Sequence, residues 1–167
     1  MTANRTDLLS VTRTLLRWGF YIDIGLMVIL VIVAAAVMLG DPSRMHLTGF
    51  QDMSQEQRLV ATRIAVVGGL VCGALALPLL RWLLAIVDST RAGDPFVPEN
   101  GSRLRRIGWV MLAINVVTHM MATAVLRGHI GFPPISVTGL MTVLLIFVLA
   151  RIFETGSRMR ADLRDTV

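Results

Sequence analysis

The sequence predicts an all-α integral membrane protein, a four-helix bundle with up-down-up-down topology. Of its 167 residues 54% are hydrophobic and only 16% are charged, whereas globular proteins carry about 25% charged residues. Four apolar runs each reach the roughly 20 residues needed to cross a hydrocarbon core. A backbone in lipid must satisfy its own hydrogen bonds, which such runs do as α-helices. We therefore expect residues 1–167 to form a single membrane domain.

The apolar runs give the expected order of elements along the chain. The predicted spans are residues 19–39, 64–87, 107–126 and 135–153. Three alanines at 34–36 resemble a signal-peptidase site, but the first run continues past them to Leu39, so it is kept as a span. The polar segment 88–106 is then a cytoplasmic loop and 154–167 a cytoplasmic tail.

The arginines predict the orientation. All 16 basic residues are arginine. If the N-terminus is cytoplasmic, twelve of them lie on the cytoplasmic side and four on the other, which is the positive-inside asymmetry. We expect a multi-pass protein of the bacterial inner membrane with both termini in the cytoplasm. The net charge of +5 could also suggest nucleic acid, but the arginines lie between apolar runs, so no direct nucleic-acid binding is expected.

Two pairs of short segments suggest a duplicated helical hairpin. "LLRWGF" at 15–20 enters the first span much as "LRRIGW" at 104–109 enters the third. "IVDS" at 86–89 leaves the second span as "IFET" at 152–155 leaves the fourth. An axis along the membrane normal would relate the two hairpins.

Two charged residues lie inside the apolar runs at similar predicted depth. Asp23 is a little over one turn into the first span, and Arg81 is a similar distance into the second. An unpaired charge at a helix centre costs about 2.5–3.5 kcal/mol on the insertion scale, so a mutual ion pair would relieve both. The pair is either a structural contact between neighbouring helices or part of a proton or substrate site. Snorkelling of each side chain to the interface is the third interpretation.

Uncharged polar residues mark the third and fourth spans. Asn115 and His119 lie one turn apart on one face, at a depth that matches Thr142, so an inter-helix polar contact is predicted. His119, Cys72 and the methionines 120, 121 and 141 are soft ligands that suit copper, but their spacing matches no metal-binding motif. Neither a metal site nor any other cofactor is expected. The glycines of Gly69-Leu-Val-Cys-Gly73 permit close helix approach or a homodimer.

The cytoplasmic loop carries clear turn chemistry. Gly93-Asp94-Pro95 predicts a turn, because proline fixes φ and the aspartate can bond the following backbone. Pro98 and Glu99 suit the first turn of a helix. The arginines that follow either fix orientation against anionic headgroups or face a soluble partner.

The segments "GDPFVPENGSRLRRIG" and "ARIFETGSRMRADLRDTV" resemble the bacterial domain-of-unknown-function 2975 family. The resemblance implies a small four-span inner-membrane protein without established enzymatic activity. It also implies a genetic link to a small helix-turn-helix DNA-binding protein, and so a regulatory partner in the cytoplasm.

The function expected from these features is regulatory. No phosphate-binding loop, HExxH or GxSxG motif is present, so we expect no enzyme and no catalytic residues. The cytoplasmic loop and tail are predicted to bind or restrain the helix-turn-helix regulator. Their candidate contact residues are Asp94, Phe96, Glu99, Asn100, Arg103, Arg105, Arg106, Arg158 and Arg160. The alternative is a small proton-coupled transporter that acts as a dimer through Asp23.

Overall fold

The computed structural model describes residues 3–40, 54–127 and 136–165 and contains four helices. They are α1 (Ala3–Leu39), α2 (Gln55–Arg91), α3 (Pro98–Arg127) and α4 (Val137–Asp165). All four are long and apolar enough to cross a membrane, and the described ranges contain no strand. The predicted all-α, four-span fold class is therefore confirmed. The α1–α2 and α3–α4 connections fall mostly in residues 41–53 and 128–135, outside the described part.

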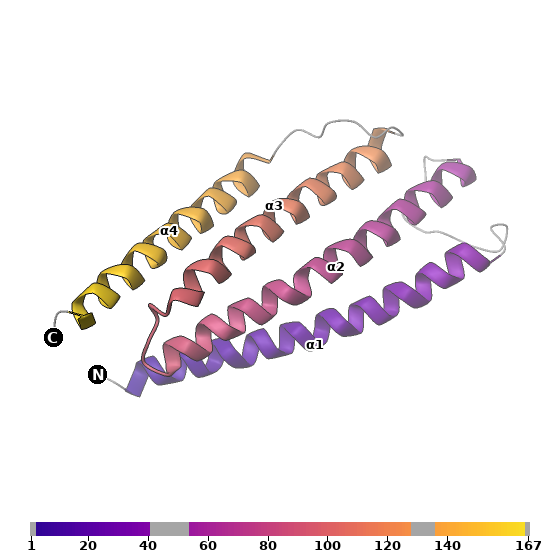
Figure 1. The fold of residues 1–167 in the computed structure, drawn as a ribbon. Coiled ribbons are helices and arrows are strands. Elements are labelled where there is room, and N and C mark those ends of the chain that lie inside the picture. The colour runs from indigo at the N-terminus through magenta and orange to yellow at the C-terminus, as the bar shows by residue number, and fades with distance from the viewer. Residues whose placement is uncertain (1–2, 41–53, 128–135, 166–167) are drawn as a thin grey trace.

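The helices are longer than the apolar runs that predicted them. The 37 residues of α1 extend about 55 Å at about 1.5 Å per residue, whereas a hydrocarbon core is about 30 Å thick. In α1, residues 3–18 form helix before the first apolar run begins, and α4 continues past the end of the fourth apolar run to Asp165. Both termini and the α2–α3 connection lie at one end of the molecule (Figure 1). The structured polar extensions therefore gather at that end.

Local sequence explains where two helices begin. Before α2, the Ser54 side chain accepts a hydrogen bond from the Gln57 amide (3.3 Å), and the Gln57 side chain accepts one from the Ser54 amide (3.0 Å). This capping box satisfies two backbone donors that the first turn leaves unpaired. α3 begins at Pro98, as the sequence predicted, because a missing N–H costs nothing there.

The helices pack in chain order, α1 on α2, α2 on α3 and α3 on α4. Figure 1 shows them side by side, with α1 and α4 at the two edges. Few side chains are buried, and many large apolar side chains are exposed, including Ile22, Ile29 and Ile32 of α1. Such a surface would be costly in water but matches lipid, which is as apolar as the side chains themselves.

Matching contacts recur in the two helical hairpins, α1–α2 and α3–α4. Gly19 of α1 lies against Leu80 of α2, and Gly108 of α3 lies against Ile146 of α4. The two glycines hold the same place in the repeated segments 15–20 and 104–109. The next residue of each segment makes a ring contact in each hairpin: Arg81 lies over the Phe20 ring, and Trp109 packs on Phe147, both at 5.4 Å.

The second repeated segment makes a similar ion pair in each hairpin, although the two arginines do not hold matching places in the repeat. Asp88 of "IVDS" pairs with Arg13 of α1 at 2.8 Å. Glu154 of "IFET" pairs with Arg105 of α3 at 3.0 Å. In each hairpin the carboxylate on the second helix therefore holds an arginine from the first. These recurring contacts are what a duplicated hairpin predicts.

Introduced cysteines should report the sidedness of this fold. In a Cys72→Ala background, Ser54→Cys lies at one end of the helices and Thr155→Cys at the other, and both positions are exposed. A membrane-impermeant maleimide applied to sealed vesicles of one orientation should label one position and spare the other. The reason is that the two positions lie at opposite ends of the spanning helices, and so on opposite sides of the bilayer. Equal labelling of both positions would contradict the four-span arrangement.

Candidate functional site: a clasp between the α2–α3 loop and α4

The α2–α3 connection is an ordered turn. α2 ends at Arg91, and the Ala92 amide still donates to the Asp88 carbonyl at 3.0 Å. Gly93 then has φ +90°, a conformation that favours glycine because a Cβ would be strained there. The Asp94 carboxylate accepts a hydrogen bond from the Phe96 amide at 3.2 Å. The turn predicted from Gly93-Asp94-Pro95 is confirmed.

A buried asparagine ties this turn to both helices. The Asn100 side chain has 0% exposure. Its amide nitrogen donates to the Ser89 hydroxyl (2.7 Å) and to the Pro95 carbonyl (2.9 Å). Its side-chain oxygen accepts from the Arg103 guanidinium at 2.8 Å. One amide group therefore joins the end of α2, the turn and the start of α3.

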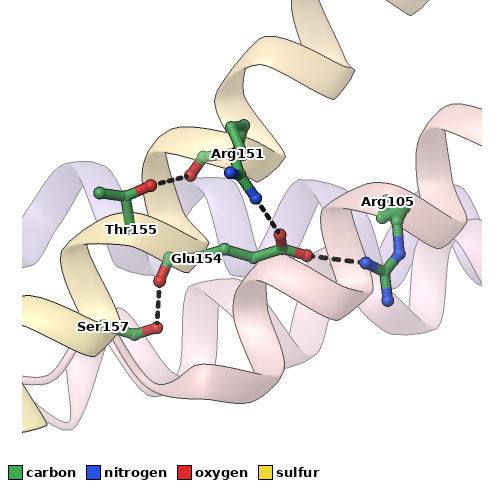
Figure 2. Close-up of polar contacts among 5 residues, drawn as sticks. All are labelled: Arg105, Arg151, Glu154, Thr155 and Ser157. Carbon is green, nitrogen blue, oxygen red and sulfur yellow. Dashed lines mark hydrogen bonds and ion pairs between the residues drawn. The ribbon is translucent and has the colours of Figure 1, made fainter.

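The start of α3 lies very close to α4. A Cβ at Gly101 would be 2.5 Å from Glu154 Cγ and 3.4 Å from Glu154 Cα, so only glycine permits this approach. The Glu154 carboxylate is partly buried and accepts from Arg105 at 3.0 Å, with Arg151 at 3.9 Å on its other oxygen. Figure 2 shows Glu154 between these two arginines, while Ser157 and Thr155 donate to backbone carbonyls of α4.

The turn itself also contacts the extension of α4. The rings of Phe96 and Phe153 are 5.2 Å apart. Phe96 lies on Gly156, where a Cβ would be 2.9 Å from the ring. Arg160 forms an ion pair with Asp94. We call this set the loop–tail clasp; its members are Asp94, Phe96, Asn100, Gly101, Phe153, Glu154, Gly156 and Arg160.

Magnitudes indicate which contacts hold the clasp together. The ion pairs Arg160–Asp94 and Arg105–Glu154 are partly exposed, and pairs of this kind contribute about 0–1 kcal/mol each. Leaving a buried polar group without its partner costs about 1–3 kcal/mol. The buried Asn100 and the close approach at Gly101 thus contribute most to the stability of the clasp. The ion pairs contribute less and help to align the loop and the start of α3 with α4.

The predicted partner residues divide into two groups. Members of the first make contacts within the protein: Asp94, Phe96, Asn100, Arg103, Arg105, Arg160 and also Arg106, whose guanidinium lies 5.9 Å from the Trp82 ring. The second group is Glu99 and Arg158, which are exposed and form no ion pair among the described residues. The sequence predicted all nine as contact residues for a partner, but it did not predict that seven of them make contacts within the protein itself.

Some members of this region were missed from the sequence. Phe153, Glu154 and Gly156 lie on α4 and complete the clasp. The available signal was that "GDPFVPEN" and "RIFETGSRMR" are the two segments that carry the family resemblance. Their joint presence is explained by direct contact between them.

Asp23 and Arg81 both lie at the α1–α2 interface, but they do not form the predicted ion pair. Arg81 lies over the ring of Phe20. Asp23 lies beside Gly73, and its Oδ2 atom is buried without a hydrogen-bond partner. The antiparallel register explains the difference. Phe20, rather than Asp23, is level with Arg81, which puts Asp23 about one turn deeper.

The polar groups of α3 and α4 are satisfied mainly within their own helices. His119 Nδ1 donates to the Asn115 carbonyl (2.9 Å), and the Thr142 hydroxyl donates to the Thr138 carbonyl (2.9 Å). Asn115 does reach across the interface, because its side chain lies against Gly139 of α4. Asn115 and His119 also line a small cavity of about 110 Å³ between the two helices. Thr142 is exposed and takes no part in that contact.

The glycines proposed for dimerisation face the protein interior. Gly69 lies against Leu30, and Gly73 lies against Met27, both on α1. This pattern therefore supports packing of α1 on α2. Within the described residues, no three His, Cys, Asp or Glu side chains are grouped so as to hold a metal ion.

Removing the buried amide should open the clasp. Asn100→Ala leaves the Pro95 carbonyl and the Ser89 hydroxyl without their partner. We expect amide hydrogens of residues 92–97 to exchange about ten- to a hundredfold faster, which corresponds to about 1–3 kcal/mol of local stability. Hydrogen-exchange mass spectrometry of the protein in micelles measures this. Glu99→Ala, at the exposed neighbouring position, should change exchange by less than about threefold; equal effects of the two variants would contradict the role of Asn100.

Comparison with known proteins gives a family and no function. The profile of a family described as "Protein of unknown function (DUF2975)" matches residues 45–167, which includes the whole clasp. No curated protein and no solved structure matches the chain. Since the match covers well over half of the sequence, the chain belongs to the DUF2975 family.

Proposed function

We propose that this protein is a regulatory protein of the bacterial inner membrane whose loop–tail clasp binds a small helix-turn-helix transcription regulator in the cytoplasm. No enzymatic activity forms part of the proposal. The regulator is held at the membrane, away from DNA, and is released when the clasp rearranges.

One observation carries the proposal. The two segments that resemble the family most closely are far apart in the chain, yet they pack together through Phe96, Asp94 and Gly101 at one end of the molecule. The α4 residues after 153 extend about 18 Å beyond the predicted span at about 1.5 Å per residue. They therefore present a structured surface to water, which a soluble partner can reach.

The charge of this surface favours a partner with an acidic face. Arg158 is exposed on α4 and forms no ion pair among the described residues. Arg91 at the end of α2 and Arg106 near the start of α3 are also exposed. A helix-turn-helix protein uses a basic surface for DNA. The contact proposed here would therefore use another face of the regulator, and electrostatic complementarity would speed its association.

The packing offers a route from the membrane to the clasp. α3 and α4 carry the Gly101–Glu154 contact outside the bilayer and the Gly108–Phe147 contact inside it. A change in how these helices pack would alter both contacts. The clasp would then shift between two arrangements, with the regulator binding one of them more tightly.

Charge reversal at the exposed arginine tests the partner surface. Arg158→Glu should reduce recovery of the regulator by about tenfold in a crosslinking pulldown of the full-length protein from cells, because the new carboxylate repels an acidic partner. Arg158 forms no ion pair among the described residues, so the change breaks none of those contacts. Arg17→Glu, at an exposed position of α1, should leave recovery within about twofold. If neither variant changes recovery, or no regulator is recovered with wild type, the proposal fails.

A charge swap distinguishes the clasp from its exposed surface. Asp94→Arg should weaken recovery because it repels Arg160 and removes the acceptor of the Phe96 amide. Adding Arg160→Asp should restore the ion pair, and with it part of the binding. A double variant no better than the single one would indicate that the clasp geometry is not what the regulator recognises.

A second function is favoured by a specific observation. Asp23 is an intramembrane carboxylate with one oxygen buried and without a hydrogen-bond partner, and Arg81 does not pair with it. Ionisable groups in membrane spans commonly mark ion or proton pathways. We therefore keep a proton-coupled transporter, acting as a dimer, as the alternative.

Asp23→Asn decides between these two functions. For a transporter the variant should abolish proton-coupled transport in proteoliposomes while its thermal stability in micelles stays within a few degrees of wild type. Gly25→Ala on the same helix, where a Cβ would meet nothing within 4 Å, is the control and should transport normally. If Asp23→Asn retains regulator binding and wild type shows no proton flux, the alternative is discarded.

A further inference from the structure

An open groove lies between α2 and α3 near the end of the molecule opposite the clasp. It has a volume of about 430 Å³. On α2 its lining includes Val67 and Val71, and on α3 it includes Val117 and Met120. Apart from Arg63 at one end, the lining residues are apolar. A polar occupant would find no hydrogen-bond partner there, so the groove suits a hydrocarbon chain.

One cation stands at the end of this groove. Arg63 contributes to the lining, and its side chain is exposed. No carboxylate in the described ranges forms an ion pair with it. An arginine commonly lays its aliphatic stem along an apolar surface and places its guanidinium at the polar edge. The apolar groove therefore ends in a positive charge that no carboxylate of the described residues neutralises.

The helix register puts this charge at the membrane interface. Gly68 of α2 lies opposite Met121 of α3, whose sulfur would clash with a Cβ at position 68. Because the two helices are antiparallel neighbours, Arg63 is level with position 126. That position is the end of the third apolar run, and Ile64 begins the second. By the limits of the apolar runs of both α2 and α3, Arg63 therefore lies at the level of the lipid headgroups.

We infer that the α2–α3 groove binds one anionic phospholipid, with its phosphate on Arg63 and an acyl chain along Val67, Val71 and Val117. The guanidinium matches a phosphate because its donors fit two phosphate oxygens at once. An apolar stretch of helix from a second copy of the chain would fill the groove but would bring no anion to Arg63. A phospholipid supplies both the chain and the charge, in the leaflet opposite the termini.

Native mass spectrometry of the full chain in micelles tests this inference. The probes are phosphatidylglycerol and phosphatidylcholine with identical acyl chains. Wild type should bind phosphatidylglycerol at least about fivefold more tightly than phosphatidylcholine. Arg63→Gln should weaken phosphatidylglycerol binding about tenfold. Arg91→Gln, at an exposed position near the other end of the same helix, should stay within about twofold of wild type.

The groove itself is tested with a matched pair of tryptophans. Val67→Trp fills the groove, whereas Val31→Trp adds the same bulk on α1 outside it; the two valines have similar exposure, 50% and 54%. Val67→Trp should reduce phosphatidylglycerol binding about tenfold, and Val31→Trp should leave it within twofold. If Val67→Trp does not fold, as judged by circular dichroism and elution volume, the Arg63→Gln result and the comparison of the two lipids decide.

Several results would overturn the inference. They are wild-type binding by Arg63→Gln, equal affinity of wild type for the two lipids, and equal loss in both tryptophan variants. Conversion of a dimer to a monomer by Arg63→Gln would assign the groove to a second copy. Loss of binding in Val67→Trp alone would assign it to a hydrocarbon chain without an anionic headgroup.

Discussion

Lipid offers the backbone no hydrogen-bond partner, and this constraint organises the whole molecule. Every crossing must be a continuous helix, and a helix in lipid gains little from burying apolar side chains against its neighbours. The spans accordingly pack in chain order with few buried residues. Directional polar contacts, such as hydrogen bonds and ion pairs, therefore gather at the helix ends, where water can solvate polar groups that remain unpaired.

The loop–tail clasp shows what polar contacts at the helix ends make possible. A buried amide at Asn100, a glycine at 101 and a ring pair at Phe96 and Phe153 create an interior where the α2–α3 turn meets α4 at one end of the molecule. That interior is small, but its contacts are directional, unlike the apolar contacts between the spans. It fixes the end of α2, the start of α3 and the extension of α4 in one arrangement. A surface of defined shape follows, and defined shape is what recognition by a soluble protein needs.

Sequence reasoning was reliable where one physical rule dominated. Length and hydropathy predicted the four helices, and Gly93 with Asp94 predicted the turn, because each depends on local chemistry. It was less reliable where register mattered. Asp23 and Arg81 were paired by counting depth along two helices, but an offset of about one turn placed Arg81 on Phe20 instead. On α4, Arg160 was predicted but Phe153, Glu154 and Gly156 were missed. Nothing local links Glu154 to Gly101, although both belong to segments that carry the family resemblance.

In the sequence, the third and fourth spans lie between the two parts of the clasp, and this has a consequence for biogenesis. A ribosome completes the Asp94 turn while α4, with Phe153 and Arg160, is still untranslated. Until the fourth helix inserts, the nascent chain offers the turn without its counterpart. The composite face therefore comes into being only after membrane insertion has finished. A cell that reads this face is reading, in the same event, that assembly of the four spans is complete.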